Sequence, residues 1–191
     1  MLPALALGAE PPRPGLLDRP PVTGHLMDRV VLRRAFGVLG PVEAIVEMVT
    51  FITVLVAAGW SLGSPVTADG IVLAASGAAF TSVVLGQLTT AVGCRSSTRT
   101  IRQVGLRGNR LLLVAMATEL ALLSLFLLWQ PLADLLDHEF PTLLGLAVAA
   151  LAIPAIVLAD TIDKHVAAHS RSKHDHAVQG QSPLLPAQRQ P

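Results

Sequence analysis

The sequence predicts an all-α membrane protein, built as a four-transmembrane-helix bundle with both termini cytoplasmic. Three observations lead to this prediction. The chain is 52% hydrophobic and only 14% charged, whereas soluble domains carry about 25% charged residues. It contains four apolar stretches that are long enough to cross a bilayer, which takes roughly 17 to 25 residues. Its Lys and Arg residues are confined to three segments that lie outside those stretches.

The four expected spans are free of Lys and Arg. They cover about residues 40–62, 70–92, 111–129 and 141–162. The first two are joined by the short turn "GSPVTAD", and the last two by "QPLADLLDHEF". We expect Pro154 to kink the fourth span, because proline has no amide hydrogen and its ring clashes with the preceding turn.

Two polar segments flank the expected spans. Residues 1–39 begin with an apolar stub and continue as the proline-rich linker "PPRPGLLDRPP", which should be extended and irregular. Residues 163–191 form a polar tail that we expect to be disordered. The sequence therefore divides into a cytoplasmic segment, a transmembrane domain over 40–162 and a cytoplasmic tail.

The orientation follows from the distribution of charge. The basic residues lie before the first span, between the second and third, and after the fourth, so an even number of spans brings all three groups to one side. The two opposite loops carry only acids: Asp69, Asp134, Asp137 and Glu139. The positive-inside rule makes the basic side cytoplasmic. We thus expect a multi-pass protein of the cell membrane.

Four polar side chains interrupt the apolar spans: Glu43, Glu47, Gln87 and Glu119. At about 1.5 Å per residue from the inner helix ends, Glu47 lies roughly 10 Å deep, Gln87 roughly 8 Å and Glu119 roughly 12 Å. These three are our candidates for a cation site or an intramembrane polar cluster, and Glu43 is expected to be a helix-end residue. The alternative is that the amide and neutralised carboxyls join neighbouring helices by hydrogen bonds.

Small residues in the spans indicate close helix packing. Gly86 and Thr90 stand one turn apart in the second span, and Gly145 opens a small-residue pair in the fourth. Other motifs are weaker. The tail residues His165, His169, His174, Asp175 and His176 are of the types that bind transition metals, although a solvated tail is the simpler interpretation. No metal ligand is assigned, and with 4% aromatic residues nucleic acid is not an expected partner.

Several quoted stretches resemble one family. "GQLTTAVGCRSSTR", "GNRLLLVAMATELALL" and "LADTIDKHVAA" look like the C-terminal membrane region, helices seven to ten, of P-type cation-transporting ATPases. "LPALALGAEPP" looks like the exit from the sixth helix, and "GPVEA" like the opening of the seventh. The resemblance runs from Leu2 to about Ala168 and implies the same four-span topology.

The resemblance also implies roles for single residues. Gln87 falls where calcium pumps place a cation-liganding carboxylate, and Glu119 matches a glutamate that sodium pumps use around their extra sodium site. Thr90 stands where those pumps have Asn or Asp, which weakens a calcium- or sodium-type site. Asp160 and Lys164 match the acidic and basic ends of the last helix, where they anchor the domain.

The complete family uses ATP and Mg, but we expect no cofactor and no catalytic residue in this chain. The phosphorylation motif, the nucleotide-binding domain and the actuator domain of such pumps are missing from the sequence. We therefore expect a fragment or split subunit that is not an enzyme alone. Its expected partners are membrane lipid, the remaining part of a P-type ATPase and the transported cation.

Two alternatives stay open from the sequence. One is a stand-alone four-span membrane protein that oligomerises or regulates a transporter through its small-residue faces. The other is a channel or a proton-conducting subunit, in which Glu47 and Glu119 would line one pore.

Overall fold

The computed structural model describes residues 2–8, 29–65, 70–96 and 109–180, with side chains described to residue 169. Over these residues the protein is helical and contains no strand. Four helices are long and apolar enough to cross a membrane: Arg29–Ala57, Gly70–Cys94, Arg110–Leu128 and Leu143–His169. The predicted all-α, four-span fold is confirmed. The proline-rich linker and most of the basic loop between the second and third spans lie outside the described residues.

The first span is a continuous helix in three parts. α2 (Arg29–Arg34) runs through the π-helical turn η1 (Ala35–Leu39) into α3 (Gly40–Ala57). The helix therefore starts earlier than the predicted span and ends before residue 62. It stops because Gly59 has φ = 93°, a left-handed conformation that glycine adopts without steric cost.

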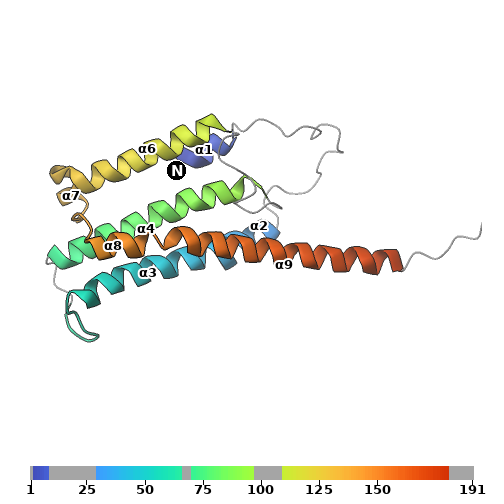
Figure 1. Cartoon of the computed structure of the whole chain (residues 1–191), viewed down its shortest axis with the longest axis horizontal. Coiled ribbons are helices and arrows are strands. Elements are labelled where there is room, and N and C mark those ends of the chain that lie inside the picture. Colours follow the sequence, from blue (N-terminus) through green and yellow to red (C-terminus); the bar gives the residue numbers. More distant parts are fainter. Residues whose placement is uncertain (1, 9–28, 66–69, 97–108, 181–191) are drawn as a thin grey trace, which may run out of the picture.

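The second span, α4 (Gly70–Cys94), is the central helix and the most buried span, with 56% of its apolar window inside the protein. α3, α8 and α9 pack against it on one side, and α6 and α1 on the other (Figure 1). Ala75 and Ala78 are fully buried against Val54 and Leu55 of α3. These small side chains let the α3 and α4 backbones approach closely.

The third span, α6 (Arg110–Leu128), carries the short helix α1 (Leu2–Gly8) along its first turns, and α7 (Gln130–Leu135) follows it (Figure 1). Asn109 fixes this arrangement. Its Oδ1 accepts a hydrogen bond from the Leu112 amide at 3.0 Å, which caps α6, and its Nδ2 donates to the Ala6 carbonyl at 3.1 Å. Ala6 and Leu112 form a small buried core beside these bonds.

The fourth span is broken, as the mid-span proline predicts. α8 (Leu143–Ala149) and α9 (Ala152–Gly180) are separated at residues 150–151. Pro154 lies four residues after Ala150. Because proline has no amide hydrogen, it cannot donate to the Ala150 carbonyl, and its ring clashes with that carbonyl in a regular helix. The Ala150 carbonyl accepts instead from Ile153 at 3.2 Å.

Part of the segment that we predicted to be a polar tail is described as helix. α9 continues without a break to Gly180, and only residues 181–191 of the tail lie outside the described part. No glycine or further proline occurs between Pro154 and Gly180, so the backbone has no reason to leave the helix before a residue that commonly ends one.

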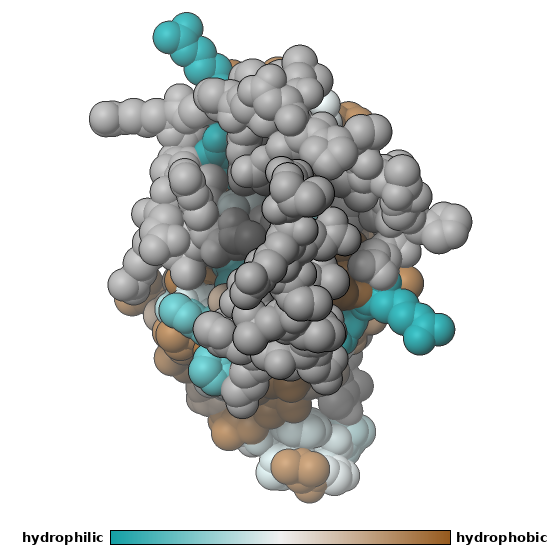
Figure 2. Space-filling view, turned by 90° about the vertical axis from the view of Figure 1, so that its right-hand side faces the viewer, coloured by the Kyte–Doolittle hydropathy of each residue, from teal (hydrophilic) through white to brown (hydrophobic). Residues whose placement is uncertain are grey.

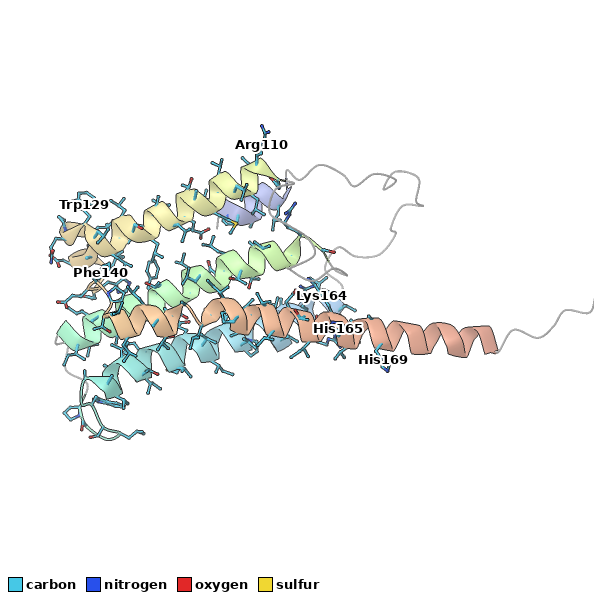
Figure 3. The ribbon with its side chains drawn as sticks, in the orientation of Figure 1. Arg110, Trp129, Phe140, Lys164, His165 and His169 are labelled. Atoms are coloured by element: carbon cyan, nitrogen blue, oxygen red, sulfur yellow. The ribbon has the colours of Figure 1, made fainter. Side chains whose placement is uncertain are left out.

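The two ends of the bundle differ in chemistry. Trp129 and Phe140 lie at one end, and Arg110, Lys164, His165 and His169 at the other (Figure 3). We call these the aromatic end and the basic end. Figure 2 faces the basic end and shows hydrophilic side chains protruding around its rim. The separation is the one expected for helices that cross a bilayer.

At the aromatic end the chain folds back against α4. The Glu139 amide donates to the Leu73 carbonyl at 3.1 Å, and the Ser76 hydroxyl lies 2.9 Å from His138 Nδ1. Gly77 makes this approach possible, because a Cβ at this position would overlap the backbone carbonyl oxygen of Glu139.

We predict that Gly77→Ala lowers the stability of the bundle. Alanine gains up to about 1 kcal/mol over glycine in a helix, but forcing a methyl group against a backbone costs about 1–3 kcal/mol. Thermal unfolding in detergent micelles, followed by circular dichroism, measures the difference. Gly8→Ala is the control, since a Cβ there meets nothing within 4 Å. A Gly77→Ala variant as stable as wild type would contradict the packing argument.

Candidate functional site

A partly open cavity, most of whose lining surface is apolar, lies between α1, α3, α4 and α6, in the half of the bundle toward the basic end. Its volume is about 280 Å³. The polar side chains that line it come from three spans, and apolar residues of α1 close one side. The full lining is Pro3, Ala4, Leu7, Glu43, Gln87, Thr90, Ala91, Cys94 and Glu119.

The cavity brings together two of the three predicted candidates. Gln87 of α4 and Glu119 of α6 both line it, but Glu47 does not. The first span contributes Glu43 instead, the residue expected to be only a helix end. All four of these side chains are partly buried.

Glu43 lines the cavity in place of Glu47 because the first helix starts earlier in the sequence than the hydropathy suggests. Arg34 lies beside the basic end of α4, so it marks the level from which depth should be counted. At about 1.5 Å per residue, Glu43 stands about 14 Å along the helix from Arg34, and Glu47 about 20 Å. Gln87 stands about 9 Å from Gly93, near the end of α4. Glu43 is thus closer to the level of Gln87.

The π-helical turn sets the direction in which Glu43 points. The Gly40 amide donates to the Ala35 carbonyl, five residues back, and a Cβ on Gly40 would lie only 2.9 Å from that oxygen. The next residue, Pro41, has no amide hydrogen to continue a regular ladder. A glycine–proline pair therefore favours the wider turn at this position.

This turn changes which residues share a face of the helix. Arg34 and Glu43 are nine residues apart, which on a regular α-helix is about 900°, or opposite faces. The π turn takes up one extra residue, so the separation becomes about 800°, or roughly 80° around the helix axis. Both side chains can then face the bundle.

Thr90 differs from other threonines of the spans. The hydroxyls of Thr50, Thr81 and Thr89 donate to the carbonyl four residues earlier, at 2.7–2.8 Å. Thr90 lines the cavity, and its Oγ1 is buried without a hydrogen-bond partner among the described residues. Thr90, which we predicted to be a packing residue, lies in the wall of the cavity.

Glu43 Oε1 is also buried without a hydrogen-bond partner in the described part of the chain. The carboxylate reaches α4 at Gly86, where a Cβ would lie 2.9 Å from this oxygen and 3.0 Å from Ile156 Cδ1 of α9. The absence of a side chain at Gly86 therefore leaves room for the Glu43 carboxylate and for Ile156. A buried oxygen without a partner is costly, and this one faces the Gly86 position of α4.

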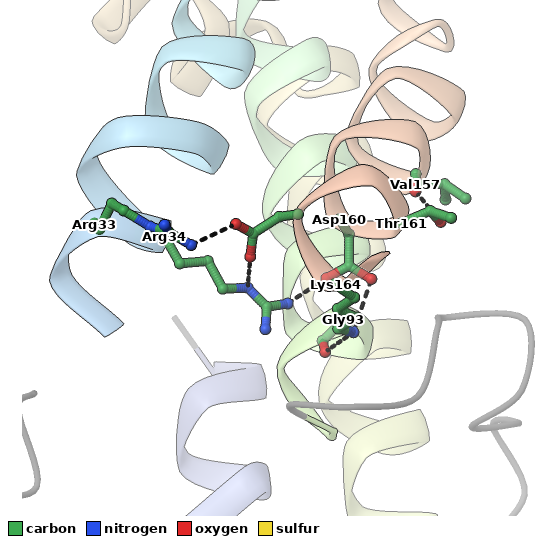
Figure 4. A network of polar contacts seen from close by, with 8 residues as sticks. Arg33, Arg34, Gly93, Val157, Asp160, Thr161 and Lys164 are labelled. Carbon is green, nitrogen blue, oxygen red and sulfur yellow. Dashed lines mark hydrogen bonds and ion pairs between the residues drawn. The ribbon is translucent and has the colours of Figure 1, made fainter. Parts of the chain in front are cut away.

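An ion-pair cluster joins three helices beside the cavity, at the basic end (Figure 4). Asp160 of α9 is 1% exposed and pairs with Arg34 of α2. Its other oxygen accepts from Lys164 Nζ at 2.8 Å, and Lys164 also donates to the Gly93 carbonyl of α4 at 3.1 Å. Asp163 adds a second carboxylate, 3.8 Å from Arg34 Nε. The pair that the resemblance assigns to anchoring thus contacts two other helices.

The remaining predicted residues lie apart from the cavity. Gly145 packs tightly, since a Cβ there would lie 2.9 Å from Ala78 Cβ and 3.2 Å from Val54 Cγ2. His165 and His169 are exposed on α9. The described residues contain no group of three or more His, Cys, Asp or Glu side chains placed to hold a metal ion, and the side chains of His174, Asp175 and His176 lie outside the described part.

Residues 1–166 match the family described as the C-terminus of cation-transporting ATPases. The chain belongs to this family. The matched region is the membrane part of cation ATPases and not their catalytic part, in agreement with the four apolar helices. A comparison with curated proteins gave no match.

The matched region includes α1, the seven-residue helix that packs against α6. Glu43 was missed because its depth depends on where α2 begins. Its signal in the sequence is the Gly40–Pro41 pair three residues before it.

We predict that Asp160→Asn destabilises this cation ATPase domain strongly. The variant leaves Lys164 buried without its carboxylate, and breaking a buried pair costs about 3–5 kcal/mol. The free energy of unfolding in mixed micelles, titrated with SDS, measures the loss. Arg33→Gln is the matched control, because the Arg33 side chain is 58% exposed and such pairs contribute about 0–1 kcal/mol. Equal losses in the two variants would contradict a special role for the buried pair.

Proposed function

We propose that this bundle braces the transport helices of a cation-transporting ATPase, and that Gln87 and Glu119 contribute to a cation site on its transport route. The bundle acts with the remainder of such an ATPase, either within one polypeptide or as a separate subunit. The observation that supports the proposal is the cavity, which oxygen-bearing side chains from α3, α4 and α6 line together in a chain of the cation-transporting ATPase family.

The donors in the cavity suit a hard cation. Carboxylate, amide and hydroxyl oxygens are the ligands that alkali and alkaline-earth ions prefer. Ionisable side chains within a membrane are costly unless they are paired or serve a site. The placement of Gln87 and Glu119 on facing helices therefore supports a transport role better than a purely structural one.

The alternative of a self-associating protein receives less support. It relied on the small-residue faces around Gly86 and Gly145 for pairing between copies. In the structure both glycines are in contact inside the bundle, Gly86 with Glu43 and Ile156, and Gly145 with Ala78 and Val54. These small-residue faces therefore pack against helices of the same chain.

We predict that Glu119→Gln weakens the cation dependence of the assembled ATPase. A tag at the native locus allows the chain and everything bound to it to be purified from membranes, and ATP hydrolysis is measured against cation concentration. The half-maximal cation concentration should rise by about tenfold, which corresponds to losing one charged ligand. Ser124→Ala on α6 is the control, because that hydroxyl bonds its own helix at 2.9 Å. A preparation without cation-stimulated ATP hydrolysis would overturn the proposal.

We predict that the basic end faces the cytoplasm of the cell. Cys94, the single cysteine, is exposed at the end of α4. A membrane-impermeant maleimide should label it in inside-out vesicles and not in intact cells, with Cys94→Ser as the unlabelled control. Labelling of intact cells would reverse the orientation.

A further inference from the structure

We propose that His165 and His169 of α9 together bind a divalent transition-metal ion such as Zn²⁺ at the basic end of the protein. The site lies apart from the cavity between the spans, and its second ligand lies beyond residues 1–166, which match the ATPase family. The inference is independent of the proposed function, because neither histidine has a part in the cation route proposed above.

The course of α9 carries the first step. The helix continues without a break from Ala152 to Gly180, so it holds His165 and His169 in helical register. The two residues stand about 6 Å apart along the helix axis and about 40° apart around it. Histidines at this spacing share one face of a helix, as they do in the helical His-Glu-x-x-His motif that binds zinc.

The ion-pair cluster turns this face away from the bundle. Asp160 is 1% exposed and Lys164 is 5% exposed, and both face α4 or the first span. Counted from Asp160, His165 lies about 140° around the helix and His169 about 180°. The contacts that bury Asp160 therefore direct the histidine pair to the opposite side of α9.

Both histidines are accessible. Their side chains are exposed, and Figure 3 shows them at the basic end, where α9 leaves the bundle. Within the described part of the chain, neither imidazole forms a hydrogen bond, an ion pair or a ring contact. Their ring nitrogens are therefore not engaged by any described group that a metal ion would have to displace.

The ligand type selects the class of ion. Imidazole nitrogen suits Zn²⁺, Cu²⁺ and Ni²⁺, whereas Mg²⁺ and Ca²⁺ prefer oxygen ligands. Zinc binds histidine nitrogen at about 2.0–2.1 Å in tetrahedral geometry, which places two ligand nitrogens about 3.3 Å apart. Side chains one helical turn apart can converge to this distance.

The pair supplies two of the four positions of a tetrahedral ion, and water can fill the other two. A two-ligand site of this kind agrees with the described residues, in which no group of three or more His, Cys, Asp or Glu side chains is placed to hold a metal ion.

The test uses the full chain, purified in detergent with a tag that contains no histidine, and ZnCl₂ as the probe. Isothermal titration calorimetry in a chelator-free buffer should show one tight Zn²⁺ site per chain. His165→Ala combined with His169→Ala should weaken this binding at least tenfold. The matched control combines His174→Ala with His176→Ala, which removes the same number of histidines from α9 and should leave the tight site unchanged.

A second variant tests the spacing at constant composition. Val166→His combined with His169→Val exchanges two residues, and Val166 is 54% exposed. The two histidines then stand about 100° apart on the helix, and adjacent residues of a helix do not face each other. This exchange variant should bind Zn²⁺ as weakly as the variant without His165 and His169. Its far-UV circular dichroism should equal that of wild type, because only exposed positions change.

Amide hydrogen exchange provides a second readout. An ion that bridges one turn of α9 opposes local opening of that turn, so Zn²⁺ should slow exchange around residues 165–169 in wild type and not in the exchange variant. The inference is overturned if wild type binds Zn²⁺ no more tightly than the variant without His165 and His169. It is equally overturned if the exchange variant keeps the tight site, or if removing His174 and His176 abolishes it. None of these results bears on the proposed function.

Discussion

The buried ion-pair cluster at the basic end is the constraint on which the rest of the structure depends. Asp160 is nearly inaccessible and forms ion pairs with two basic side chains, Arg34 at the start of the first span and Lys164 on its own helix. Through Lys164 the same group reaches the Gly93 carbonyl near the end of α4. Buried charges are tolerated only in such complete arrangements. A helix that slid along its neighbours by one turn would leave charges unpaired, so the cluster fixes the relative heights of three helices.

Those heights decide which acid of the first span reaches the cavity. With Arg34 held at the level of Gly93, Glu43 comes near the level of Gln87 and Glu47 passes beyond it. The π turn between Arg34 and Glu43 is equally necessary, because without it the two side chains would face opposite ways around the helix. The Gly40–Pro41 pair is therefore a structural requirement of both the ion-pair cluster and the cavity.

The sequence predicted what local chemistry determines. Hydropathy alone located four spans, and the position of Pro154 was enough to place the break in the fourth. Gln87 and Glu119 stood out because polar residues in apolar runs are rare. The sequence could not predict the choice between Glu43 and Glu47, since both lie on one face and their depths depend on a contact with α9 that is more than a hundred residues away. The sequence also contains no indication that α9 continues to Gly180. A polar composition is typical of disordered segments, and no packing partner for this segment can be recognised in the sequence.

The cavity owes its shape to the way α6 is held. Toward the aromatic end α6 packs directly on α4, where Leu123 and Leu127 meet Val84 and Leu88. Toward the basic end its buried residues meet α1 instead, through Ala6 and Leu112. α1 thus occupies the space between the two spans and forms one wall of the cavity. The opposite wall, at Glu43, belongs to helices that the ion-pair cluster holds together. A displacement of α1 would therefore change the environment of Glu119 and Gln87 first, while Glu43 stayed fixed by Gly86 and Ile156.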